Sequence, residues 1–108
     1  MIEARDDSIF EAMTPLGFAV CLMRSRWNII ARVKHPVMAG KEDMVRLTLV
    51  EPVEIRRSRQ DARVYLFYRP ERADRWICAV AKRLDGEGFL ITAYPTDAMK
   101  EGEKAWTR

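Results

Sequence analysis

The hydrophobic pattern changes its period near residue 53, and this change constrains the fold more than any other feature of the chain. Residues 63–69 alternate apolar and polar side chains, as expected for a strand with one buried face. Residues 75–83 are apolar on both faces through their middle, which is typical of a central strand, so the run from Ile77 to Ala81 should be the most buried segment. With shorter runs at 53–58 and 88–94, and an Asp-Gly turn before the last run, the pattern predicts an antiparallel four-stranded meander.

The first half of the chain predicts a hairpin and two helices. Apolar runs at 9–13 and 18–23 flank Thr-Pro-Leu-Gly, which is turn chemistry. A helix is expected from Ser25, as its N-cap, to His35, because the proline that follows His35 disfavours the helical region. A second short helix is expected over 41–50. Because the helices precede an antiparallel meander in sequence, we expect an α+β fold with both helices on one face of the sheet.

The length and composition are those of one domain, expected to span residues 1–108. Cys21 and Cys78 lie far apart in apolar stretches, so free thiols are favoured over a disulfide, and a reducing, cytoplasmic compartment is expected. With one histidine and two distant cysteines, neither a metal site nor a cofactor is expected. No apolar run approaches ~20 residues and the N-terminus is acidic, so no membrane span and no signal peptide are expected.

Two tryptophans are expected to have structural roles. Trp27 shares its helix face with apolar residues, which indicates a core position. Trp106 lies in a polar tail and is expected to hold the terminus against a sheet edge. One helical turn is expected in the tail after Pro95.

Positive charge is concentrated in two segments. Residues 24–34 contain four cations and no acid, and residues 56–72 contain six arginines against two acids. Solvated faces would explain both segments. Alternatively, the two segments meet on one surface that binds phosphate.

Four pieces of the sequence, in order, resemble a known pattern. They are GFAVCLMRSRWNIIARVKHPVM, TLVEPVEIRRS, VYLFYR and FLITAYPTDAMKEGEKAW, which together cover most of the chain from the first hairpin onward. The pattern is similar to small phage- and plasmid-associated domains grouped with the barnase–EndoU–colicin–RelE-like nucleases. The resemblance implies a barnase/RelE-like fold, metal-independent ribonuclease activity and, as for many toxins of this group, a cognate antitoxin or immunity protein. One departure is Asn28, where the pattern often has a histidine after the tryptophan; asparagine cannot shuttle protons near neutral pH.

Metal-free RNA cleavage needs a proton acceptor for the 2′-hydroxyl and a proton donor for the leaving oxygen. His35 is the candidate acid or base, although it could instead cap the helix C-terminus. Thr92 and Tyr94 are predicted to lie on one strand face, opposite Phe89, and to share a cleft with His35. Their place in the resembling TAY step adds to this prediction, whereas ordinary β propensity would also explain Thr92.

Cations and aromatic rings would complete such a site. Arg57, Arg63 and Arg69 are candidate phosphate ligands, with surface solubility as the alternative. Tyr68 could stack on a base or could simply pack within the sheet.

Three functions are consistent with these features. The first is a metal-independent ribonuclease, and the second is a catalytically inactive RNA- or protein-binding module of the same fold. The third is an antitoxin-type or structural partner. RNA is therefore the expected partner, with the protein as a monomer or a homodimer.

Overall fold

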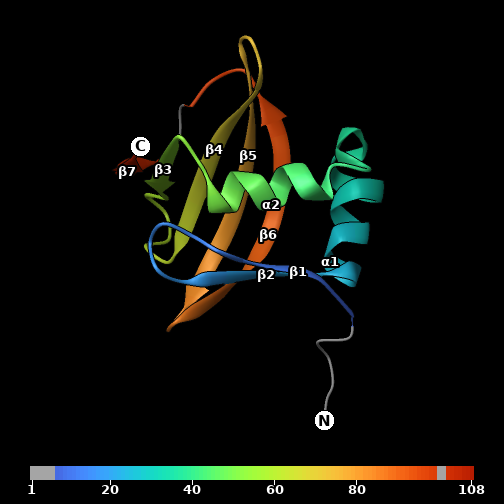
Figure 1. Ribbon diagram of the computed structural model, residues 1–108, viewed down its shortest axis with the longest axis horizontal. Helices are drawn as coiled ribbons and strands as arrows, with labels where there is room; N and C mark the ends of the chain where they lie inside the picture. The colour runs from blue at the N-terminus through green and yellow to red at the C-terminus, as the bar shows by residue number, and fades with distance from the viewer. Residues whose placement is uncertain (1–6, 100–101) are drawn as a thin grey trace.

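A single mixed sheet of seven strands forms the centre of the protein (Figure 1). The computed structural model describes residues 7–99 and 102–108. The strands lie in the order β1-β2-β6-β5-β4-β3-β7. Their bounds are β1 (Ser8–Met13), β2 (Ala19–Met23), β3 (Glu54–Arg57), β4 (Val64–Arg72), β5 (Arg75–Leu84), β6 (Glu87–Thr96) and β7 (Glu103–Thr107).

The sheet is larger than the predicted meander because both ends of the chain join it. Strands β3 to β6 pair antiparallel with their sequence neighbours. The hairpin β1–β2 adds beside β6 through a short parallel pairing, and β7 adds antiparallel to β3 at the other edge. The helical turn expected in the tail is therefore wrong for residues 103–107. Trp106 of this strand lies opposite Ile55 and packs against the main core, which confirms its expected role at the sheet edge.

Helical segments fill the chain between β2 and β3. They are α1 (Arg24–Ile29), the π-helical segment η2 (Ile30–Lys34), the 3₁₀ turn η3 (Pro36–Met38) and α2 (Glu42–Val50). The first helix begins directly after β2 at Met23, without a side-chain cap, so the prediction of Ser25 as N-cap is wrong. The expected end at His35 is confirmed: its N–H donates to the Ile30 carbonyl at 2.7 Å, and Pro36 follows. Within the described residues, no helix combines the length and apolar character needed to cross a membrane.

The main core lies between the sheet and α2, which crosses β4 and β5 (Figure 1). Val45 and Leu49 of α2 are fully buried there. From β5, Ile77 and Ala79 belong to this core, and the expected burial of the strand's apolar middle is confirmed. Helix α1 contacts β2 and β6, and Trp27 is buried in the same core, as expected.

The opposite face of the sheet has a smaller apolar cluster. Leu66, Tyr68 and Cys78 are buried there. Trp76, Val80, Tyr94 and Met99 are partly buried against them. Cys21 and Cys78 do not form a disulfide, as expected.

A β-bulge in β6 changes which side chains share a face. Val80 pairs with Thr92 while Ala81 pairs with Leu90, so one residue of β6 is unmatched. Phe89, opposite Lys82, therefore lies on the same face as Thr92. The predicted alternation, which put Phe89 opposite Thr92, is wrong because the extra residue shifts the period by one.

Candidate nucleic-acid interface

Two of the three predicted catalytic residues, Thr92 and Tyr94, lie in the second half of β6, and the third, His35, lies between η2 and η3. The rings of His35 and Tyr94 are in contact, with centroids 5.5 Å apart and planes tilted by 43°. Thr92 lies two residues before Tyr94 on the same strand face. Its Oγ1 is buried and neither donates nor accepts a hydrogen bond within the described part of the chain. The structure thus brings His35 and Tyr94 together, with Thr92 beside them on the strand.

Two of the predicted RNA-binding residues make structural contacts. Tyr68 is 2% exposed and packs with Leu66, so it cannot stack on a base in this fold; the packing alternative is correct. The Nη1 of Arg69 donates to the Glu51 carbonyl at 2.6 Å and so satisfies a carbonyl just past the end of α2. The sequence pattern cannot separate these roles from phosphate binding, because both depend on which strands become neighbours.

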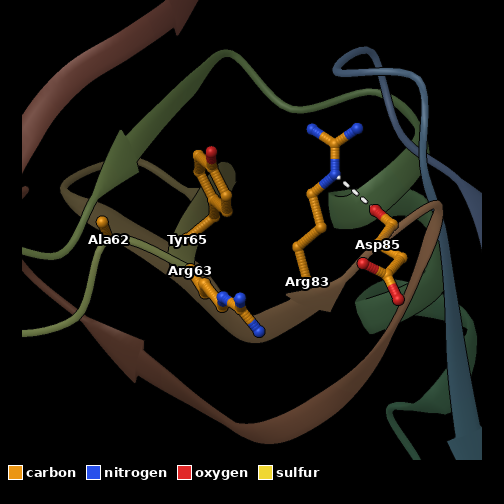
Figure 2. Close-up of a pocket in the computed structure, with 5 residues that line it drawn as sticks. All are labelled: Ala62, Arg63, Tyr65, Arg83 and Asp85. Atoms are coloured by element: carbon orange, nitrogen blue, oxygen red, sulfur yellow. Dashed lines mark hydrogen bonds between the residues drawn. The ribbon is translucent and has the colours of Figure 1, made fainter.

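Arg57 and Arg63, in contrast, come together around a residue that the sequence did not single out. Two hollows share Tyr65 as a lining residue. One, of about 260 Å³, is also lined by Arg63 and Arg83 (Figure 2). The other, of about 500 Å³, is also lined by Arg57 and Lys104. These five residues are called the Tyr65 surface below.

The turn before β4 fixes the position of Arg63. Its backbone N–H donates to Asp61 Oδ1 at 2.9 Å, and the Lys82 Nζ lies 3.3 Å from Asp61 Oδ2. The N–H of Arg63 and then the Lys82 ammonium hold the pKa of Asp61 below its ordinary value, so the carboxylate stays charged. The Ser58 N–H also donates to the Val64 carbonyl across this turn, at 2.9 Å. Hydrogen bonds of Arg63 itself and of the neighbouring Val64 therefore hold the backbone at Arg63 in place.

Packing against Phe18 orients Arg83 and Tyr65. The Arg83 guanidinium lies 5.0 Å from the centroid of the fully buried Phe18 ring. Its Nε donates to the backbone carbonyl of Asp85 at 3.0 Å (Figure 2). Tyr65 packs on the same ring, with centroids 5.8 Å apart. Figure 2 shows Tyr65 and Arg83 projecting side by side from neighbouring strands. One buried ring thus supports both an aromatic face and a cation.

A close approach between β7 and β3 brings Lys104 beside the end of β3. Gly102 precedes β7 with a φ of +84°, a conformation that favours glycine. A Cβ at this position would lie 2.6 Å from the Arg57 carbonyl oxygen. Only glycine permits this approach without displacement of the backbone, so Gly102 helps to form the hollow between Arg57 and Lys104.

The charge of the hollows is positive. Arg57, Arg63, Arg83 and Lys104 line them, against the carboxylates of Asp85 and Glu103. Among residues 7–99 and 102–108, the guanidinium groups of Arg57 and Arg63 form no ion pair. These two cations are therefore available to an anionic ligand.

The two basic segments of the sequence do not form one surface. Residues 24–34 lie beside β2 and β6, whereas Arg57 and Arg63 lie at β3 and the start of β4, beyond β5. In the described part of the chain, no group of three His, Cys, Asp or Glu side chains could hold a metal ion.

Comparisons of the chain with protein-family models, with curated proteins and with solved structures find no match. The resemblance to the barnase–EndoU–colicin–RelE-like nucleases therefore stays a prediction.

Proposed function

We propose that this protein binds single-stranded RNA through the Tyr65 surface. The observation that carries the proposal is the convergence of four cations, from separate strands and turns, on one partly exposed tyrosine. Proteins that bind single strands combine cations that follow the phosphates with aromatic rings on which bases stack. Arg57 and Arg63 would contact phosphates, and Tyr65 would stack on a base.

Salt dependence tests the phosphate contacts. Binding of a fluorescein-labelled RNA of about 12 nucleotides is measured by fluorescence anisotropy at several salt concentrations. A single strand loses about 0.7 units of log–log slope for each phosphate contact removed. The double variant Arg57→Gln, Arg63→Gln should therefore reduce the slope by about 1.4.

A matched variant separates a local effect from a loss of net charge. Arg46 on α2 and Arg72 at the far end of β4 are exposed, and Arg46→Gln, Arg72→Gln removes the same total charge. This control should leave the slope within about 0.3 units of the original. Equal slopes for both double variants would contradict the proposal. Tyr65→Leu should weaken binding by at least about fivefold if the ring stacks on a base.

A metal-independent ribonuclease of the barnase/RelE-like kind is the second candidate, and the ring contact between His35 and Tyr94 favours it. A general acid or base has to come within about 3 Å of its target proton, directly or through one water. Tyr94 pairs with Cys78 of β5. Arg83 lies five residues further along β5, which is about 17 Å from Cys78, and its side chain is on the other face of the sheet. Cleavage at His35 therefore requires a phosphate bound near Tyr94, separate from the Tyr65 surface. A cognate antitoxin or immunity protein remains part of this second candidate alone.

A further inference from the structure

An apolar stripe lies exposed along the outer side of α1, η2 and η3. Ile29, Val33 and Val37 are 44%, 75% and 51% exposed. Ile29 and Val33 are four residues apart in one continuous helical segment, so they lie on the same side of it. Val37 is exposed in the next turn, η3, beyond the break at His35. Of the six large hydrophobic residues exposed in the described chain, three belong to this segment. They are called the α1 stripe below.

The inner side of the same segment is fixed in the core. Trp27 and Ile30 are 4% and 0% exposed, and Met38 of η3 is 0% exposed. Rotation that buried the α1 stripe would expose these three side chains instead. The stripe therefore stays at the surface unless another molecule covers it.

Four cations lie in the same helical segments as the α1 stripe. Residues 12–41 contain no aspartate or glutamate. Arg24, Arg26, Arg32 and Lys34 lie in α1 and η2. Within residues 7–99 and 102–108, none of these four cations forms an ion pair. The segment from α1 to η3 thus combines exposed aliphatic side chains with cations and no acid.

We propose that the α1 stripe and its four cations dock an acidic amphipathic segment of a partner protein. Charge complementarity requires carboxylates on the partner, and the α1 stripe requires apolar side chains in register with them. This site is separate from the Tyr65 surface and goes beyond RNA binding.

Two other anionic partners fit the α1 stripe less well. RNA presents hydrated phosphates, which gain nothing from contact with three aliphatic side chains. A helix that lies in a membrane interface usually inserts Trp, Phe or Leu by about 5–10 Å. The exposed apolar residues here are short aliphatic side chains on a helix whose other side is fixed in the core.

A synthetic peptide provides the test. The probe has about 16 residues, roughly four helical turns, with leucines on one side and glutamates beside them. A peptide of the same composition, with its leucines distributed around the helix, is the control. NMR spectra of the ¹⁵N-labelled protein should shift at Ile29, Val33 and Val37 on addition of the first peptide, and much less with the second. Val33→Glu should weaken peptide binding at least about tenfold, while RNA binding stays unchanged.

Met13→Glu is the matched protein variant, because Met13 is 59% exposed on an edge strand away from the α1 stripe. It should leave peptide affinity unchanged. The proposal is overturned if the two peptides bind equally, or if the shifts lie outside α1 to η3. It is also overturned if Val33→Glu abolishes self-association or binding to anionic lipid vesicles instead of peptide binding. Melting temperatures of both variants establish that they are folded.

Discussion

Replacement of Gly88 by alanine should destabilise the protein, because the backbone of the neighbouring strand occupies the space of the added methyl group. Gly88 lies in β6 opposite Arg83. A Cβ built there collides with the Lys82 carbonyl oxygen, and it lies 3.1 Å from Cε2 of Phe18 and 3.3 Å from Cα of Arg83. Two of these three atoms belong to the main chain of β5, so no side-chain rotation relieves the contact.

The magnitude follows from the cost of overpacking. Extra atoms forced into a packed region destabilise by about 1–3 kcal/mol, a range that already includes the gain of at most about 0.8 kcal/mol from burial of the methyl group. We expect a net loss of about 1–3 kcal/mol in the free energy of unfolding. For a chain of this length, 1 kcal/mol corresponds to about 4 °C, so the melting temperature should fall by about 4–12 °C. Urea titration and thermal scans followed by circular dichroism measure both quantities.

Gly86 in the same hairpin is the matched control. An added Cβ there has no atom within 4 Å, and its φ is not positive. Gly86→Ala should therefore be neutral, or stabilise by up to about 1 kcal/mol through the lower entropy of the unfolded chain. If Gly88→Ala were as stable as Gly86→Ala, the close approach of β5 and β6 would not constrain residue 88, and the reasoning would be refuted.

Two further predictions concern charged groups. The Lys41 ammonium, 2.6 Å from Glu71, is the first cause that holds the pKa of Glu71 below its ordinary 4.5, and Arg75 adds to it. This stabilisation is present above pH 4.5 and is lost as the pH falls through the lowered pKa of Glu71. Glu71→Gln should therefore lower the free energy of unfolding by about 1 kcal/mol at pH 7 and by much less at low pH. Urea titration at both pH values measures the difference. If the protein cleaves RNA in EDTA, His35→Ala should slow cleavage about 10²-fold in a gel assay. RNA affinity at the Tyr65 surface, measured by anisotropy, should not change. Absence of cleavage by the unaltered protein would contradict the ribonuclease candidate.

Local patterns of the sequence predicted the parts of the fold that depend on neighbouring residues. The period-two run of β4 and the two-sided apolar run of β5 define these strands without reference to the rest of the chain. Pro36 likewise marks the end of the first helical segment. Each of these signals acts within a few residues, so tertiary contacts do not override it.

Features that depend on distant partners were missed. The segment Glu103–Thr107 is mostly polar and becomes a strand because β3 offers an unpaired edge and Ile55 a contact for Trp106. The bulge in β6 likewise depends on pairing with β5. Both features decide where the candidate residues lie.

The sequence predicted only part of the candidate site, because the rest also depends on residues that are distant in sequence. Arg57 and Arg63 are on a shared surface, but Tyr65 and Arg83 complete it only because Phe18, from the first hairpin, packs beneath both. Nothing in the local sequence around Tyr65 indicates that contact.

The short parallel pairing of β2 with β6 also sets when a newly synthesised chain can complete its sheet. Cys21 and Phe89 pair although they are roughly 70 residues apart in sequence, and contacts of such separation form slowly. The hairpin β1–β2 is synthesised before its partner strand β6, with the helices and the strands β3 to β5 between them. Until then, Val20 and Leu22, which are fully buried in the finished protein, lack the strand and core that cover them. They are among the apolar side chains that stay uncovered on the nascent chain until β6 is made.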